Sequence, residues 1–307
     1  MGGTSEFMIE VVQKLKEVFE VSSEHSIAFQ YLGISMKQRE DSAIVISQET
    51  YVDSLKTIPI SQQRIQEQEQ VITKQERKEL RSAVGKLNWL SGTTRPDLSF
   101  SVGQISFAKT ANVKNIVKAN KVISQAKSSQ TDVLFPKLKS IEEARIVVFT
   151  DASLMNLDDG GSQGGHIIFL TDGVDCCPIT WQSRKIKRIV RSTLAAETLA
   201  FVDGCEAGYM INQLLKEIMG ESYVEKPIIC FTDNMSLYDS SHTTNTVTDR
   251  RLLTEINIVR QMVSNKEIEL KWCSSENQTS DVLTKLGAAG GKLREILHSG
   301  KFFSKIL

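Results

Sequence analysis

The sequence predicts a two-part protein, with a mainly helical first part and an α/β second part built on a mixed sheet. The chain has 307 residues, which favours about two domains of roughly 150 residues each. Helical periodicity dominates the first part, whereas strands and helices alternate after residue 144. Between them, residues 128–143 are rich in Ser, Gln and mixed charges. We therefore place the domains at 8–135 and 136–307.

In the first part, apolar residues three and four positions apart predict helices. Residues 1–7 are expected to be a leader outside the fold. Two strands, 29–38 and 42–48, are predicted around a polar turn, and 59–73 is predicted to be loop. The predicted helices span 9–20, 48–58, 74–92, 96–110 and 113–127.

In the second part, short apolar runs predict strands and are interrupted by helical patterns. The dipeptide Asp172-Gly173 is a hairpin signal between the second and third strands. The predicted strands span 144–151, 163–171, 174–181, 227–233 and 266–272. A long helix is predicted after Ser192, and shorter ones over 251–263 and 279–287.

The composition excludes several classes of protein. Lys plus Arg equals Asp plus Glu at 37 each, so any nucleic-acid surface must be local. The five Cys are odd in number and form no CxxC, which argues against a disulfide framework and a zinc site and favours a reducing compartment. No apolar run of about 18 residues predicts a membrane span, so no membrane partner is expected, and no signal peptide is evident.

Two apolar strands run directly into a carboxylate. VVFTD ends at Asp151 and IICFTD ends at Asp233. In mixed sheets, ligands gather at the carboxyl ends of strands, so these two side chains would converge if the strands are neighbours. Converging buried carboxylates repel, and a hard cation such as Mg²⁺ or Mn²⁺ is the usual compensation.

Two further acids fit the same site. Glu197 lies among apolar residues early in a predicted helix, and Asp281 follows the last predicted strand. Four carboxylates from four elements could hold two metal ions about 4 Å apart. A single strand-end Asp is more often a cap or turn residue, but four acids in this order favour the metal site.

Five stretches of the second part follow one another in a set order. They are VVFTDAS (147–153), QGG (163–165), ITWQSRKIKRIVRSTLAAETLA (179–200), CFTDN (230–234) and QTSDVLTK (278–285). Together they resemble the ribonuclease H domain of copia-type retrotransposon Pol polyproteins. The resemblance implies a ribonuclease H-like mixed five-stranded sheet with helices.

The first part resembles the segment that follows the polymerase active site in the same reverse transcriptases. The stretches that carry this likeness are FQYLGISM (29–36), VISQETYVDSL (45–55) and GKLNWLSGTTRPDLSFSV (85–102). This implies a mainly helical thumb- or connection-like domain with a few palm-like strands. The family's Y/F-x-D-D polymerase strand is absent from the chain, so polymerase activity is not expected from this chain alone.

The resemblance also implies an activity. The ribonuclease H family cuts the RNA strand of RNA–DNA hybrids, and Asp151, Glu197, Asp233 and Asp281 would ligate two divalent ions. Ser153 and Asn234, beside two of these acids, would contact the substrate. The implied partners are the hybrid duplex and the remainder of a reverse transcriptase polyprotein. The implied location is intracellular: the cytoplasm, virus-like particles or the nucleus.

A basic run, RKIKRIVR, precedes the helix that carries Glu197. It could be a solvated face, but phosphate contacts are favoured; the basic residues are Arg184, Lys185, Lys187, Arg188 and Arg191. The loop 274–281 lacks the His found in cellular and retroviral relatives, and Glu276 is the candidate replacement. The alternative is a catalytically weak or inactive domesticated element that binds nucleic acid or a partner.

Overall fold

A small antiparallel sheet follows the first helix. The computed structural model describes residues 5–19, 27–106, 110–129, 131–220, 223–243, 249–288 and 290–303. After α1 (Ser5–Val18), four strands pair in sequence order: β1 (Ala28–Tyr31), β2 (Ile34–Gln38), β3 (Ile44–Ser47) and β4 (Val133–Phe135).

One prediction for this sheet needs correction. The single strand predicted over 29–38 is wrong, because the chain reverses at Leu32 and Gly33, which have φ of 50° and 79°. Strand β4 lies inside the composition change at 128–143 and pairs with β3. That segment therefore includes part of the first sheet, and the domain boundary remains a prediction.

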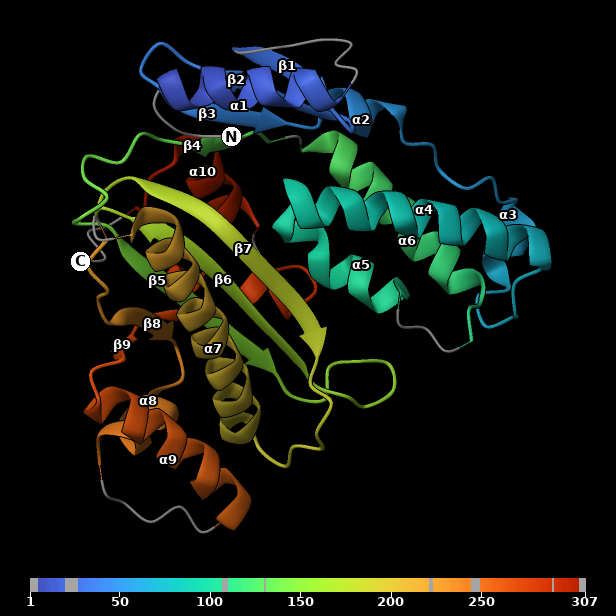
Figure 1. The fold of residues 1–307 in the computed structure, drawn as a ribbon. Coiled ribbons are helices and arrows are strands. Elements are labelled where there is room, and N and C mark those ends of the chain that lie inside the picture. The colour runs from blue at the N-terminus through green and yellow to red at the C-terminus, as the bar shows by residue number, and fades with distance from the viewer. Residues whose placement is uncertain are drawn as a thin grey trace.

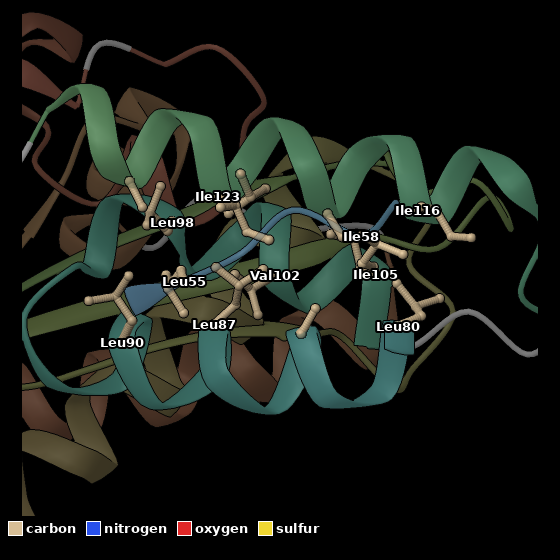
Figure 2. Packing of buried hydrophobic residues seen from close by; sticks show 14 of the residues in the cluster. Leu55, Ile58, Leu80, Leu87, Leu90, Leu98, Val102, Ile105, Ile116 and Ile123 are labelled. Carbon is tan, nitrogen blue, oxygen red and sulfur yellow. The ribbon is translucent and has the colours of Figure 1, made fainter. Parts of the chain in front are cut away.

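A group of helices forms a hydrophobic core in the first part of the chain. Its elements are α2 (Glu49–Ser54), α3 (Gln62–Gln66), α4 (Lys74–Thr93), the 3₁₀ turn η1 (Pro96–Leu98), α5 (Ser99–Ser106) and α6 (Val113–Ser128). Helix α3 lies within 59–73, so the prediction of loop there is wrong. Thr73 and Glu76 form a reciprocal capping box that starts α4. Leu87, Leu90 and Leu98 are fully buried in the core between these helices (Figure 2).

The second part is built on a mixed five-stranded sheet, as predicted. Its strands are β5 (Arg145–Ser153), β6 (Gln163–Thr171), β7 (Cys176–Lys185), β8 (Ile228–Thr232) and β9 (Ile268–Trp272). Their order in the sheet is β7-β6-β5-β8-β9. The first three strands form an antiparallel meander, whereas β8 and β9 run parallel to β5. Strands β5 and β8, which lead into the two Asp residues, are therefore neighbours.

Helices cover both faces of this sheet. Helix α7 (Thr193–Met219) runs along one face (Figure 1), where Phe201 packs with Val148. Helix α10 (Gly291–Ser299) covers the other face, where Leu293 packs with Phe149. None of the described helices combines the length and apolar composition that crossing a membrane requires.

The remaining elements follow β8 and β9. They are α8 (Met235–His242), α9 (Arg250–Ser264) and two 3₁₀ turns, η3 (Ser275–Asn277) and η4 (Asp281–Leu283). The helix predicted over 279–287 is wrong, because only the short turn η4 forms there. Helices α8 and α10 were not predicted.

Buried polar contacts join the two parts. Trp181 on β7 donates its indole N–H to the carbonyl of Ser91 at the end of α4, at 2.7 Å. Asp97 in η1 pairs with Arg95 through two hydrogen bonds of 2.8 and 2.9 Å. Arg294 on α10 reaches the same carboxylate at 3.0 Å. Turn η1 also packs directly against η4, so the helical part supports the turn that carries Asp281.

Candidate metal centre

Three of the four predicted acids meet at one edge of the mixed sheet. Asp151 lies near the end of β5, and Asp233 directly follows β8, its parallel neighbour. Glu197 lies in the first turns of α7, whose N-terminus is capped by the Ser192 hydroxyl. One carboxylate oxygen from each of the three acids lies within 4.8 Å of the others. The predicted convergence of Asp151 and Asp233 is confirmed.

The acids lie deep in the protein. Asp151 is 0% exposed and Glu197 is 4% exposed. Glu197 Oε2 is buried and has no hydrogen-bond partner among the described residues. Asp233 is less buried and accepts a hydrogen bond of 2.8 Å from the Ser275 hydroxyl. A buried carboxylate oxygen without a donor is costly, so Glu197 is placed to bind a cation.

The electrostatics show the same deficit of positive charge. Burial raises the pKa of Glu197 to about 9, and the carboxylates of Asp151 and Asp233 raise it as well. Burial also raises the pKa of Asp151 to about 7, although Lys285 and Thr284 act in the opposite direction. A divalent cation between these side chains would stabilise their charged forms, and hard oxygen ligands suit Mg²⁺ or Mn²⁺.

The fourth acid, Asp281, lies beside the cluster and is bound to a lysine. Lys285 Nζ lies 2.8 Å from Asp281 Oδ1 and 3.2 Å from Asp151 Oδ1. The group of three acids close enough to share one ion does not include Asp281. Its role as a ligand remains a prediction.

Sequence reasoning missed the residues that hold the turn η4 in place. Thr284, just after η4, donates its hydroxyl to Asp151 Oδ2. Gln278 donates from its amide to the carbonyl of Thr150 at 2.9 Å. Ser183 on β7 donates to the carbonyl of Leu283. All of them lie inside the stretches quoted for the resemblance, so the motifs contain structural partners of the acids as well as the acids themselves.

No family model matches the chain. Two retrovirus-related Pol polyproteins of Arabidopsis thaliana are similar to it. The one from transposon RE1 is 26% identical over 210 residues, and the one from transposon RE2 is 27% identical over 212. Each match covers 67% of this chain and 14% of the polyprotein. The chain is distantly homologous to copia-type retrotransposon Pol polyproteins. It spans only about a seventh of the length of these relatives.

Solved structures are similar at lower identity. The foamy viral protease-reverse transcriptase in complex with RNA/DNA hybrid has 14% identity and a TM-score of 0.46, covering 90% of this chain and 34% of that one. Ribonuclease H1 from the archaeon Halobacterium salinarum has 14% identity and a TM-score of 0.34, covering 46% of this chain and 94% of that one. The chain has the mixed five-stranded sheet with helices that the sequence resemblance implied.

Two of the predicted substrate contacts, Ser153 and Asn234, lie close to the acids in the chain. Asn234 accepts a hydrogen bond from the backbone N–H of Leu237 and caps α8. Ser153 is partly buried at the end of β5. Their contact with a substrate remains a prediction.

The basic run is partly neutralised by the protein. Arg184 pairs with Asp203, Lys185 with Asp159 and Arg188 with Glu255. Lys187 and Arg191 are exposed, and within the described part of the chain no ion pair involves them. These two are the strongest phosphate-contact candidates, since they need not break a pair within the protein. To bind a phosphate, Arg184, Lys185 and Arg188 would first have to give up their carboxylate partners within the protein.

Proposed function

We propose that this chain is the ribonuclease H region of a retrotransposon reverse transcriptase, with the end of the palm and a thumb- or connection-like unit before it. Its activity is metal-dependent cleavage of the RNA strand in RNA–DNA hybrids. The observation that carries the proposal is the meeting of Asp151, Glu197 and Asp233 at one sheet edge, with a buried, partnerless oxygen on Glu197. The distant homology with Pol polyproteins supports it.

The three acids would hold Mg²⁺ or Mn²⁺. A bound ion in such a centre lowers the pKa of the attacking water and stabilises the leaving oxygen. The chain itself orients the ligands: Thr284 fixes one oxygen of Asp151, and Ser275 fixes one oxygen of Asp233.

The substrate would be held by its phosphates and recognised by its sugar. Lys187 and Arg191 lie in the segment that leads into α7, the helix that carries Glu197. Phosphate contacts position a duplex without reading its sequence. The 2′-hydroxyl, present only on the RNA strand, would supply the distinction between RNA and DNA. The remainder of a reverse transcriptase is the proposed protein partner.

The test is cleavage of an end-labelled RNA–DNA hybrid with Mg²⁺ and, separately, with Mn²⁺. RNA–RNA and DNA–DNA duplexes serve as substrate controls. The variant is Asp151→Asn, and the matched control is Asp239→Asn, an exposed acid on α8. We expect RNA-strand cuts that leave 5′-phosphate and 3′-hydroxyl ends, lost in Asp151→Asn and kept in the control.

Two results would overturn the proposal. Cutting that survives Asp151→Asn would place the activity elsewhere or in a contaminant. No cutting with either metal, together with salt-sensitive hybrid binding, would favour a nucleic-acid-binding module instead.

A further inference from the structure

Lys285 lies between two carboxylates of the centre. Its backbone N–H donates to the carbonyl of Asp281 at 3.0 Å, which places the side chain one turn after that acid. Its ammonium then bridges Asp281 Oδ1 at 2.8 Å and Asp151 Oδ1 at 3.2 Å. The other oxygen of Asp151 accepts the hydroxyl of Thr284. Both oxygens of Asp151 are therefore engaged by residues that follow η4.

We propose that Lys285 supplies the second cation of this centre, so that the acids Asp151, Glu197 and Asp233 bind one divalent ion rather than two. This inference rests on the proposed function and changes the number of ions that the resemblance implied. It makes Lys285 a positioning residue of the centre and removes Asp281 from the set of metal ligands.

The Lys285 ammonium and a second metal ion cannot occupy the same position at once. A Mg²⁺ shared by Asp151 and Asp281 would need to lie about 2.1 Å from an oxygen of each. The ammonium of Lys285 already lies between those two oxygens and contacts both. An ion there would also repel the ammonium strongly at such a separation, so either the ion or the lysine occupies the position.

Burial and charge favour the lysine. The Asp151 side chain is 1% exposed and that of Lys285 is 41% exposed. The lysine therefore reaches into the buried site from solvent along its aliphatic stem. Its ammonium contacts the carboxylates of both Asp151 and Asp281, so it offsets one negative charge of the centre.

The three acids Asp151, Glu197 and Asp233 lie close enough together to share one ion. Glu197 Oε2 has no partner in the described protein, and Asp233 and Glu197 do not contact Lys285 through any hydrogen bond or ion pair among the described residues. A single divalent ion bound there, with Lys285, brings three positive charges to four carboxylates. In this arrangement Asp151, Glu197 and Asp233 would bind the one ion, and Lys285 would stay between Asp151 and Asp281.

The test counts bound ions directly. Mn²⁺ is titrated into the full chain, and bound Mn²⁺ is measured by electron paramagnetic resonance of the free ion and by isothermal titration calorimetry. The variant is Lys285→Met, which removes the charge and keeps the length of the stem. Lys285→Arg keeps the charge, and Lys301→Met removes a remote surface lysine that lies 4.0 Å from Asp175.

We expect one Mn²⁺ in the wild type, in Lys285→Arg and in Lys301→Met, and two in Lys285→Met. The second ion should bind the Lys285→Met variant at least about tenfold more tightly than the wild type, because a unit charge within about 4 Å of its ligands is gone. Two ions in the wild type would overturn the inference, as would one ion in a folded Lys285→Met. No Mn²⁺ in any variant would instead overturn the proposed function. The wild-type count decides the matter even if Lys285→Met fails to fold.

Discussion

Replacement of Glu197 by Gln should stabilise the metal-free protein at alkaline pH. Glu197 is buried, and one of its oxygens has no partner in the described protein. Burial and two neighbouring carboxylates raise its pKa from 4.5 to about 9. The folded protein therefore keeps a proton that the unfolded chain has lost, and the free energy of unfolding must fall as pH rises across that window.

The size of the effect follows from the shift. One pKa unit corresponds to about 1.4 kcal/mol, so a rise from 4.5 to about 9 bounds the destabilisation at about 6 kcal/mol. At pH 8 the bound is about 5 kcal/mol, and relaxation around a buried charge relieves part of it. We expect Glu197→Gln to exceed the wild type by about 3 kcal/mol at pH 8 and by almost nothing at pH 4.

The assay is guanidinium unfolding between pH 4 and pH 9 in EDTA, followed by circular dichroism and by hydrogen exchange of β5 and α7. Glu206→Gln, an exposed acid on the same helix, is the control and should follow the wild-type curve. In excess Mn²⁺ the order should reverse, because the wild type gains ligand stabilisation that the variant cannot. Parallel pH curves for the wild type and Glu197→Gln would refute the reasoning.

Three further predictions concern the turn η4, the basic run and the contact between the two parts. Gly165 on β6 faces η4 so closely that an added Cβ would lie 2.6 Å from a side-chain carbon of the turn. The substitution Gly165→Ala should therefore displace η4 and weaken Mn²⁺ binding about tenfold. Unchanged Mn²⁺ binding would show that η4 does not orient the site. The double change Lys187→Ala and Arg191→Ala should lower the slope of log affinity against log salt by about 2 for a hybrid; an unchanged slope would remove both from the phosphate contacts. The substitution Asp97→Asn should lower the free energy of unfolding by about 3–5 kcal/mol, because it leaves the 1% exposed Arg95 side chain without its carboxylate partner. A loss below about 1 kcal/mol would mean that this buried ion pair contributes little to stability.

Much of the fold and of the metal centre can be predicted from the sequence, because the patterns that predict them are local. Apolar runs that end in Asp151 and Asp233 predict both strands and the edge at which the acids meet, and the structure confirms this. Helix α10 has apolar Leu293 and Ile296 at helical spacing, so its sequence does contain a helical pattern. Helix α8 is eight residues long, too short to show a convincing period.

Other features depend on contacts that a linear pattern does not contain. A helix was predicted over 279–287, but Leu283 packs against Gly165 and the chain forms only a 3₁₀ turn there. Asp281 and Lys285 are four residues apart, but this spacing does not show that the ammonium of Lys285 also reaches Asp151. That contact requires the turn to be docked against β5, which only the tertiary structure supplies.

The hydroxyl of Thr284 offers the sharpest test of how the turn prepares the centre. It donates to Asp151 Oδ2, and this hydrogen bond lowers the pKa of a carboxyl that burial has raised. Without it, Asp151 would hold its proton more tightly and lose a fixed orientation, and both effects weaken cation binding. Thr284→Val keeps the shape and removes the donor, so we expect Mn²⁺ affinity to fall about 10–100-fold at pH 7.

Two comparisons separate chemistry from packing at this position. Thr284→Ser restores the hydroxyl and loses a methyl group, so its Mn²⁺ affinity should lie close to that of the wild type. The deficit of Thr284→Val should also shrink as pH rises above the raised pKa of Asp151, because a carboxyl that is already ionised no longer needs the donor to lose its proton. Equal losses in Thr284→Ser and Thr284→Val, constant across pH, would mean that the side chain acts by packing η4 against β5 and that its hydrogen bond contributes little to the centre.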